Sequence, residues 1–142
     1  MIRASAAITF LTLFVGCGQS PSLPSPVMFN VAGTWVLQHP SEASQTMMLL
    51  EQTGTGVTGT WSQTVRSLVT NGFVSGSVSR DQLSISAELV TQNGISQPCV
   101  TLVRGVLAIS EDSLAGVLSS VRQPPCSGRP ALLTYTFRKT TH

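Results

Sequence analysis

The stretch of sequence that decides the fold is Leu83-Ser84-Ile85-Ser86-Ala87-Glu88-Leu89. Its odd-numbered positions are apolar and its even-numbered positions are polar, which is the period of two typical of a half-buried β-strand. Because alternate side chains point to opposite faces, all the apolar side chains lie on one face. The stretch therefore predicts a strand that buries one face against a core.

The same alternation continues on both sides of this stretch, and turn signals interrupt it at regular intervals. It predicts eight strands, at 31–38, 46–52, 56–64, 72–79, 82–91, 99–109, 114–122 and 131–139. The predicted turns are Gly54-Thr55-Gly56, Asn71-Gly72, Arg80-Asp81, Asn93-Gly94, Glu111-Asp112 and the Pro-rich stretch 124–128. Short connections make sequential strands neighbours, and eight such strands remove their exposed edges by closing. We expect an all-β fold, an antiparallel up-and-down barrel of about eight strands, with a two-sheet β-sandwich as the alternative.

The composition agrees with a single β domain and argues against several classes of protein. The chain has 142 residues, of which only 10% are charged, well below the roughly 25% of an average soluble domain. Its net charge of +2 comes without a basic cluster, which argues against a nucleic-acid partner. The hydrophobic content of 42% argues against disorder.

The first seventeen residues have the pattern of an export signal. Arg3 supplies a positive charge, residues 6–15 are an apolar run with Thr, and the small Gly16 directly precedes Cys17. The apolar run has about half of the ~20 residues needed to span a bilayer core, so it predicts a signal-peptide core and not a membrane helix.

The end of this segment, Phe14-Val15-Gly16-Cys17, resembles the bacterial lipobox, with Phe14 where the family usually has Leu. The resemblance implies cleavage before Cys17 and lipidation of its thiol, so that a lipid anchor holds the protein in the cell envelope. The domain would then lie in the periplasm or outside the cell. A conventionally cleaved secreted protein is the alternative. We divide the chain into a signal peptide at 1–16, the lipidated Cys17 with a Pro- and Ser-rich flexible tether at 17–30, and a β-barrel domain at 31–142.

The three cysteines support this interpretation, because an odd thiol in an exported protein needs an explanation. Lipidation of Cys17 leaves Cys99 and Cys126 as a pair in an oxidising compartment, where a disulfide is expected. The two lie almost symmetrically about Glu111-Asp112, so antiparallel pairing of the flanking strands brings them together. No CxxC spacing or companion His supports a metal site, and no cofactor is expected.

Gly33-Thr34-Trp35 opens the first predicted strand and Arg138 lies in the last. This pattern resembles the calycin group, the lipocalins and avidins. The resemblance implies that Arg138 stacks on Trp35 at the closed end of the barrel and that the mouth binds a small molecule. The domain is shorter than a typical lipocalin. Since the chain has only two tryptophans, biotin binding is not implied.

The sequence contains no convincing catalytic constellation, and we expect no enzyme. The stretch 54–59 matches G-x-G-x-x-G, but a strand-like run follows it where a dinucleotide site needs a helix. The loop His39-Pro40-Ser41-Glu42 has a base, a hydroxyl and a carboxylate without a nucleophile elbow. Arg104 interrupts an apolar run. It is a candidate for orienting an anionic head group inside the barrel, although we favour an outward-facing position.

Two functions therefore remain open. The first is a lipid-anchored envelope barrel that binds a small apolar or amphiphilic molecule. The second is a non-enzymatic envelope lipoprotein with a filled barrel whose surface engages a protein partner. Fold alone does not choose between them, because an eight-stranded barrel either holds one small ligand or is filled by side chains.

Overall fold

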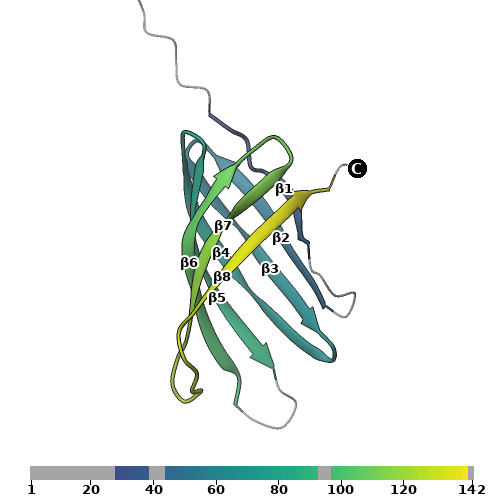
Figure 1. Ribbon diagram of the computed structural model, residues 1–142, viewed down its shortest axis with the longest axis vertical. Helices are drawn as coiled ribbons and strands as arrows, with labels where there is room; N and C mark the ends of the chain where they lie inside the picture. The colour runs from purple at the N-terminus through teal and green to yellow at the C-terminus, as the bar shows by residue number, and fades with distance from the viewer. Residues whose placement is uncertain (1–27, 39–43, 93–96, 141–142) are drawn as a thin grey trace, which may run out of the picture.

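The computed structural model describes residues 28–38, 44–92 and 97–140. The strands are β1 (Gly33–Leu37), β2 (Ser44–Thr53), β3 (Gly56–Val65), β4 (Leu68–Ser79), β5 (Gln82–Gln92), β6 (Cys99–Ile109), β7 (Ser113–Arg122) and β8 (Ala131–Lys139). Each strand pairs antiparallel with the next, and β8 pairs with β1 to close the barrel (Figure 1). The predicted up-and-down barrel is confirmed, and the sandwich alternative is wrong. None of the described residues belongs to a helix that is long and apolar enough to cross a membrane.

The period of two determines which side chains fill the barrel. In β5 the apolar side chains Leu83, Ile85, Ala87 and Leu89 are all buried, as the alternation predicts. The other strands contribute inward side chains in the same way, including Met48, Leu107 and Leu114, each without exposed surface. The core is therefore the interior of a single closed sheet.

One predicted turn is wrong. Asn71-Gly72 lies inside β4, where Asn71 pairs with Ser62 and Gly72 with Trp61. The turn comes earlier, at Arg66-Ser67 between the paired residues Val65 and Leu68, and Arg66 adopts the positive φ of 56° that such a turn needs. Gly72 serves close packing instead: a Cβ there would overlap the carbonyl oxygen of Glu88 on β5. The strand approaches its neighbour too closely for a side chain, as coiled strands of small barrels do.

The chain before β1 covers one end of the barrel, which we call the closed end. Val31 has no exposed surface, and the N–H of Trp35 Nε1 donates to the Val31 carbonyl over 2.8 Å. Gln52 holds this segment, because its Oε1 accepts from Val31 N at 2.8 Å and its Nε2 donates to the Phe29 carbonyl at 3.1 Å. Phe29 falls within the tether predicted at 17–30, but it packs against the core. The packed part of the chain thus begins slightly before residue 31.

Candidate functional site

The opposite end of the barrel, which we call the mouth, holds a cavity of about 560 Å³. The β3–β4 turn and the loop 123–130 lie at this end, at the bottom of the view in Figure 1. A volume of this size is within the roughly 300–1,000 Å³ of small-molecule pockets. The interior is therefore filled toward the closed end and hollow toward the mouth.

The floor of the cavity is apolar and aromatic. Trp61, Leu89 and Val103 line it and are each buried. The indole of Trp61 meets the rings of Tyr135 and Phe137 edge to face, with centroids 5.9 and 5.6 Å away. Tyr135 and Phe137 are themselves stacked at 5.8 Å. Aromatic rings in these geometries attract each other, so Tyr135 and Phe137 help to hold the indole of Trp61 in place in the floor.

Trp61 also carries a polar group at this depth. Its indole Nε1 is buried and has no hydrogen-bond partner among the described residues. A buried donor without an acceptor is costly, and native structures contain few of them.

A belt of polar side chains lies above the floor. It consists of Gln63, Thr70, Thr91, Thr101, Ser120 and Tyr135, all half-buried. The hydroxyls of Thr70 and Thr91 hydrogen-bond each other across β4 and β5 at 2.8 Å. Desolvation by burial raises the pKa of the Tyr135 hydroxyl above its usual value of 10.0. The hydroxyl is protonated at neutral pH and can donate a hydrogen bond.

The rim combines cationic and apolar side chains. Arg122 ends β7 on its inward face, and Arg129 follows in the loop 123–130. Leu68 and Leu133 also line the mouth, with 45% and 48% of their surface exposed. No carboxylate of the described residues lines the cavity. The rim thus offers positive charge and unburied apolar surface together.

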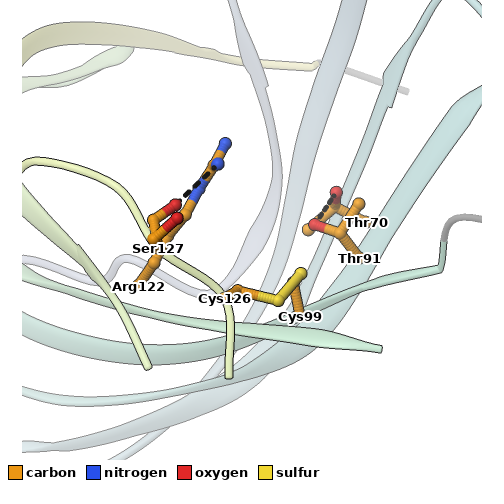
Figure 2. Close-up of a disulfide and its surroundings, with 6 residues drawn as sticks. All are labelled: Thr70, Thr91, Cys99, Arg122, Cys126 and Ser127. Carbon is orange, nitrogen blue, oxygen red and sulfur yellow. Dashed lines mark hydrogen bonds between the residues drawn. A yellow bond between two sulfur atoms is a disulfide. The ribbon is translucent and has the colours of Figure 1, made fainter. Parts of the chain in front are cut away.

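The predicted disulfide is confirmed, and it holds the rim loop. Cys99 and Cys126 are bonded with their Cα atoms 5.7 Å apart, at the start of β6 and in the loop 123–130. Gln123 N donates to the Val100 carbonyl at 2.8 Å, and Cys126 N donates back to the Gln123 carbonyl at 3.0 Å, which turns the loop toward Cys99. In Figure 2 the disulfide lies between Arg122 with Ser127 on one side and Thr70 with Thr91 on the other.

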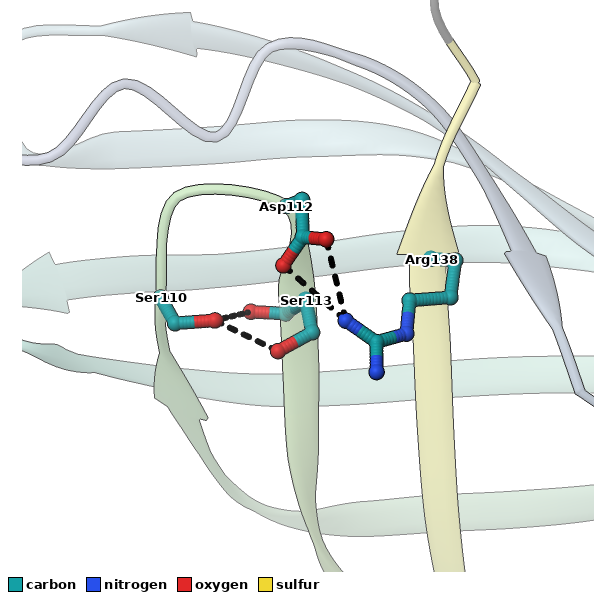
Figure 3. A network of polar contacts seen from close by, with 4 residues as sticks. All are labelled: Ser110, Asp112, Ser113 and Arg138. Carbon is teal, nitrogen blue, oxygen red and sulfur yellow. Dashed lines mark hydrogen bonds and ion pairs between the residues drawn. The ribbon is translucent and has the colours of Figure 1, made fainter.

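The predicted stack of Arg138 on Trp35 is wrong by one residue. Trp35 is paired with Lys139, whose Nζ lies 5.3 Å from the centroid of the indole, whereas Arg138 is paired with Val36. Neighbouring residues of a strand point to opposite faces, so Arg138 points outward. There its Nη1 donates to both carboxylate oxygens of Asp112 at 3.0 Å (Figure 3).

Arg104 lies on the outer wall, where it is exposed and its backbone pairs with Ser119. Our favoured outward position is confirmed, and the hypothesis that Arg104 orients a head group inside the barrel is wrong. Gly54-Thr55 forms the β2–β3 turn ahead of a strand, as expected for a hairpin. Cys17 and the loop His39-Pro40-Ser41-Glu42 lie outside the described residues, so the predictions made for them are not tested by the structure.

Sequence reasoning did not identify Arg122 and Arg129. Arg122 continues the even-numbered inward positions of β7 after Leu114, Leu118 and Ser120, so counting alternate residues to the end of the strand could have placed it inside the barrel. Arg129 has no such signal, because it lies in a loop whose path depends on the disulfide.

Comparison with known proteins adds no further assignment, since no family model, curated protein or solved structure matches this chain.

Proposed function

We propose that this protein is an exported, lipid-anchored β-barrel that binds a small amphiphilic molecule in its mouth, without catalysis. The observation that carries the proposal is the cavity of about 560 Å³, with its buried floor and its opening at one end of a barrel otherwise filled with side chains. A purely structural barrel would gain stability by filling this space.

The chemistry of the lining favours an amphiphilic ligand over a wholly apolar one. The floor around Trp61 offers apolar contact, whereas the belt above it presents hydroxyl and amide groups. A hydrocarbon chain that filled the whole cavity would leave those polar groups without water and without partners, which is unfavourable. A ligand with an apolar body and polar substituents satisfies both layers.

Binding of N-phenyl-1-naphthylamine, a neutral fluorescent probe with an apolar body and one amine, tests the site. We expect saturable binding with one probe per chain, measured by fluorescence and calorimetry. Ser120→Phe places a ring in the cavity and should weaken binding at least tenfold. Val117→Phe on the outer wall of the same strand is the matched control and should leave binding unchanged. Equal binding by both variants would place the probe outside the mouth and contradict the proposal.

The lipid anchor at Cys17 is a separate part of the proposal. The Cys99–Cys126 disulfide supports export, because such bonds persist in oxidising compartments, and it leaves Cys17 outside the pair. Metabolic labelling with a radioactive fatty acid should mark the wild-type protein. Cys17→Ser should lose the label and leave the membrane fraction. A variant that remained membrane-bound after processing would contradict lipidation.

We also propose that the barrel is calycin-like. The closed antiparallel barrel of eight strands and the position of Gly33-Thr34-Trp35 at the start of β1 support this relationship. The cation over the tryptophan comes from Lys139 instead of an arginine, so the closing contact has the same chemistry from a neighbouring position.

A second candidate function is the engagement of an envelope protein. The observation that favours it is Phe73 on the outer wall of β4, which is 78% exposed and lies beside a hollow also lined by Val90 and Asn71. Large exposed apolar side chains mark interaction sites on many proteins. A photo-crosslinking residue at position 73 should yield one discrete adduct in intact cells that the same residue at Ser77 does not. Identical adduct patterns would contradict this function.

A further inference from the structure

We infer that the amphiphile bound in the mouth is an anion, and that Arg122 and Arg129 bind its negatively charged head group at the rim. The inference rests on the proposed function and specifies the chemical class of the ligand. Three observations support it: the positive charge at the rim, the hydrogen-bond donors there that have no partner among the described residues, and the contact between the loop 123–130 and Arg122.

The two ends of the barrel differ in their charge: the described charged side chains at the mouth have one sign, whereas those at the closed end have both. The described side chains that are charged at neutral pH and lie at the mouth are all cationic, namely Arg66, Arg122 and Arg129. The closed end carries both signs, with Asp81, Glu111 and Asp112 beside Arg80, Arg138 and Lys139. An anion approaching the mouth therefore meets positive charge without a competing carboxylate among the described residues, and partial exclusion of water strengthens that attraction.

The two ends also differ in how their arginines are paired. At the closed end Arg138 is neutralised by Asp112. At the mouth the guanidinium of Arg122 has one contact among the described residues, a long hydrogen bond of 3.4 Å from Nη1 to the Ser127 carbonyl. A guanidinium has five N–H donors, so Arg122 retains donors for a carboxylate, sulfonate or phosphate.

The rim loop holds Arg122 in position. A Cβ at Gly128 would come within 3.0 Å of Cδ of Arg122, so the loop backbone lies against the aliphatic stem of this side chain. The disulfide at Cys126 ties the same loop to β6 (Figure 2). A pre-positioned guanidinium loses less conformational entropy when it binds an anion.

The remaining polar groups of the cavity complement the same class of ligand. The hydroxyls of Tyr135, Thr101 and Ser120 line the same cavity and can donate hydrogen bonds to an anion. Together with the arginines they make the cavity rich in donors. Its ligand should therefore be rich in acceptors, as an anionic amphiphile is.

The test compares two probes that share one skeleton, the neutral N-phenyl-1-naphthylamine and its sulfonated counterpart 1-anilinonaphthalene-8-sulfonate. We expect the wild-type protein to bind the sulfonate at least tenfold more tightly. Arg122→Gln with Arg129→Gln should remove that preference, since a charge-assisted hydrogen bond contributes roughly tenfold or more to affinity. Binding of the neutral probe should change less than about twofold, because its contacts lie deeper.

Arg104→Gln is the matched control, because it removes one exposed arginine from the outer wall and should leave both affinities unchanged. Thermal unfolding of each variant checks that it is folded. Displacement of the sulfonate by decanoate, decyl phosphate and decanol then separates the head groups: the two anions should compete and the alcohol should not.

Each outcome has a distinct meaning. If neither probe binds, the proposed function itself is wrong. If the neutral probe binds but the sulfonate has no advantage, or the advantage survives in the double arginine variant, the mouth binds amphiphiles and the inference of an anionic ligand is overturned. A loss of sulfonate binding in Arg104→Gln equal to that of the double variant would also overturn it, because the effect would then be one of overall charge.

Discussion

The ammonium group of Lys139 lies over the indole of Trp35, with 5.3 Å between Nζ and the ring centroid. The two residues are directly paired between β8 and β1, at the seam where the barrel closes. Trp35 in turn donates to the Val31 carbonyl and so holds the segment that covers the closed end. The contact therefore links β8 and β1 to the segment before β1 that covers the closed end.

A double-mutant cycle should detect this contact. We expect Trp35→Leu and Lys139→Met to be coupled by about 1 kcal/mol in the free energy of unfolding, the usual size of a cation–π interaction. Denaturant titration of the four proteins measures it. The control cycle pairs Trp35→Leu with Arg138→Met, which should be additive within about 0.5 kcal/mol because Arg138 points to the other face. Coupling to Arg138 instead of Lys139 would mean that the register of β8 is shifted by one.

The disulfide should be a major source of stability. Replacing both Cys99 and Cys126 with Ser removes a cross-link of sequence separation 27, which corresponds to about 3.6 kcal/mol in the chain-entropy model. The loss can be measured by urea unfolding. Reductant should destabilise the wild-type protein by a similar amount and leave the double variant unaffected. A smaller loss would show that the reduced denatured chain is already compact.

Gly72 should not tolerate even a methyl group. A Cβ at this position would overlap the Glu88 carbonyl, so Gly72→Ala must displace a paired strand and should cost about 1–3 kcal/mol or more. Gly56→Ala is the matched control, because its Cβ would lie 3.4 Å from the Thr53 carbonyl oxygen, an ordinary contact. Thermal unfolding of both variants checks the difference, and equal midpoints would mean that β4 and β5 are further apart than described.

Tyr135 should titrate above its usual pKa. It is the only tyrosine of the chain, so the ultraviolet absorbance of phenolate reports on it alone. Burial raises its pKa in the folded state, and denaturant should return the midpoint to about 10.

The sign of the effect on stability follows from the same shift. Above pH 10 the unfolded chain loses this proton before the folded one does, so the contribution of Tyr135 is complete below pH 10 and is lost as the pH rises through the folded-state pKa. Tyr135→Phe should flatten this part of the pH profile. An unchanged profile would show that other groups cause the alkaline loss.

The alternation along Leu83–Leu89 and its neighbours determined most of the fold. It placed eight strands with their ends within two residues of the observed ones, except that β4 begins four residues earlier than expected. The short connections made a closed up-and-down barrel the natural solution. The cysteine pair was also predictable, since both residues flank one hairpin. These features depend on local pattern and chain connectivity, which the sequence contains.

Three features required the tertiary structure. Asn71-Gly72 has the composition of a turn, but pairing with β3 and close approach to β5 keep it within a strand. The choice between Arg138 and Lys139 depends on register, because a shift of one residue exchanges the two faces. The mouth combines Trp61 on β3, Leu89 on β5, Arg122 on β7 and Tyr135 on β8. Side chains so distant in sequence form one site only because the sheet closes into a ring and a disulfide folds the loop back over its end.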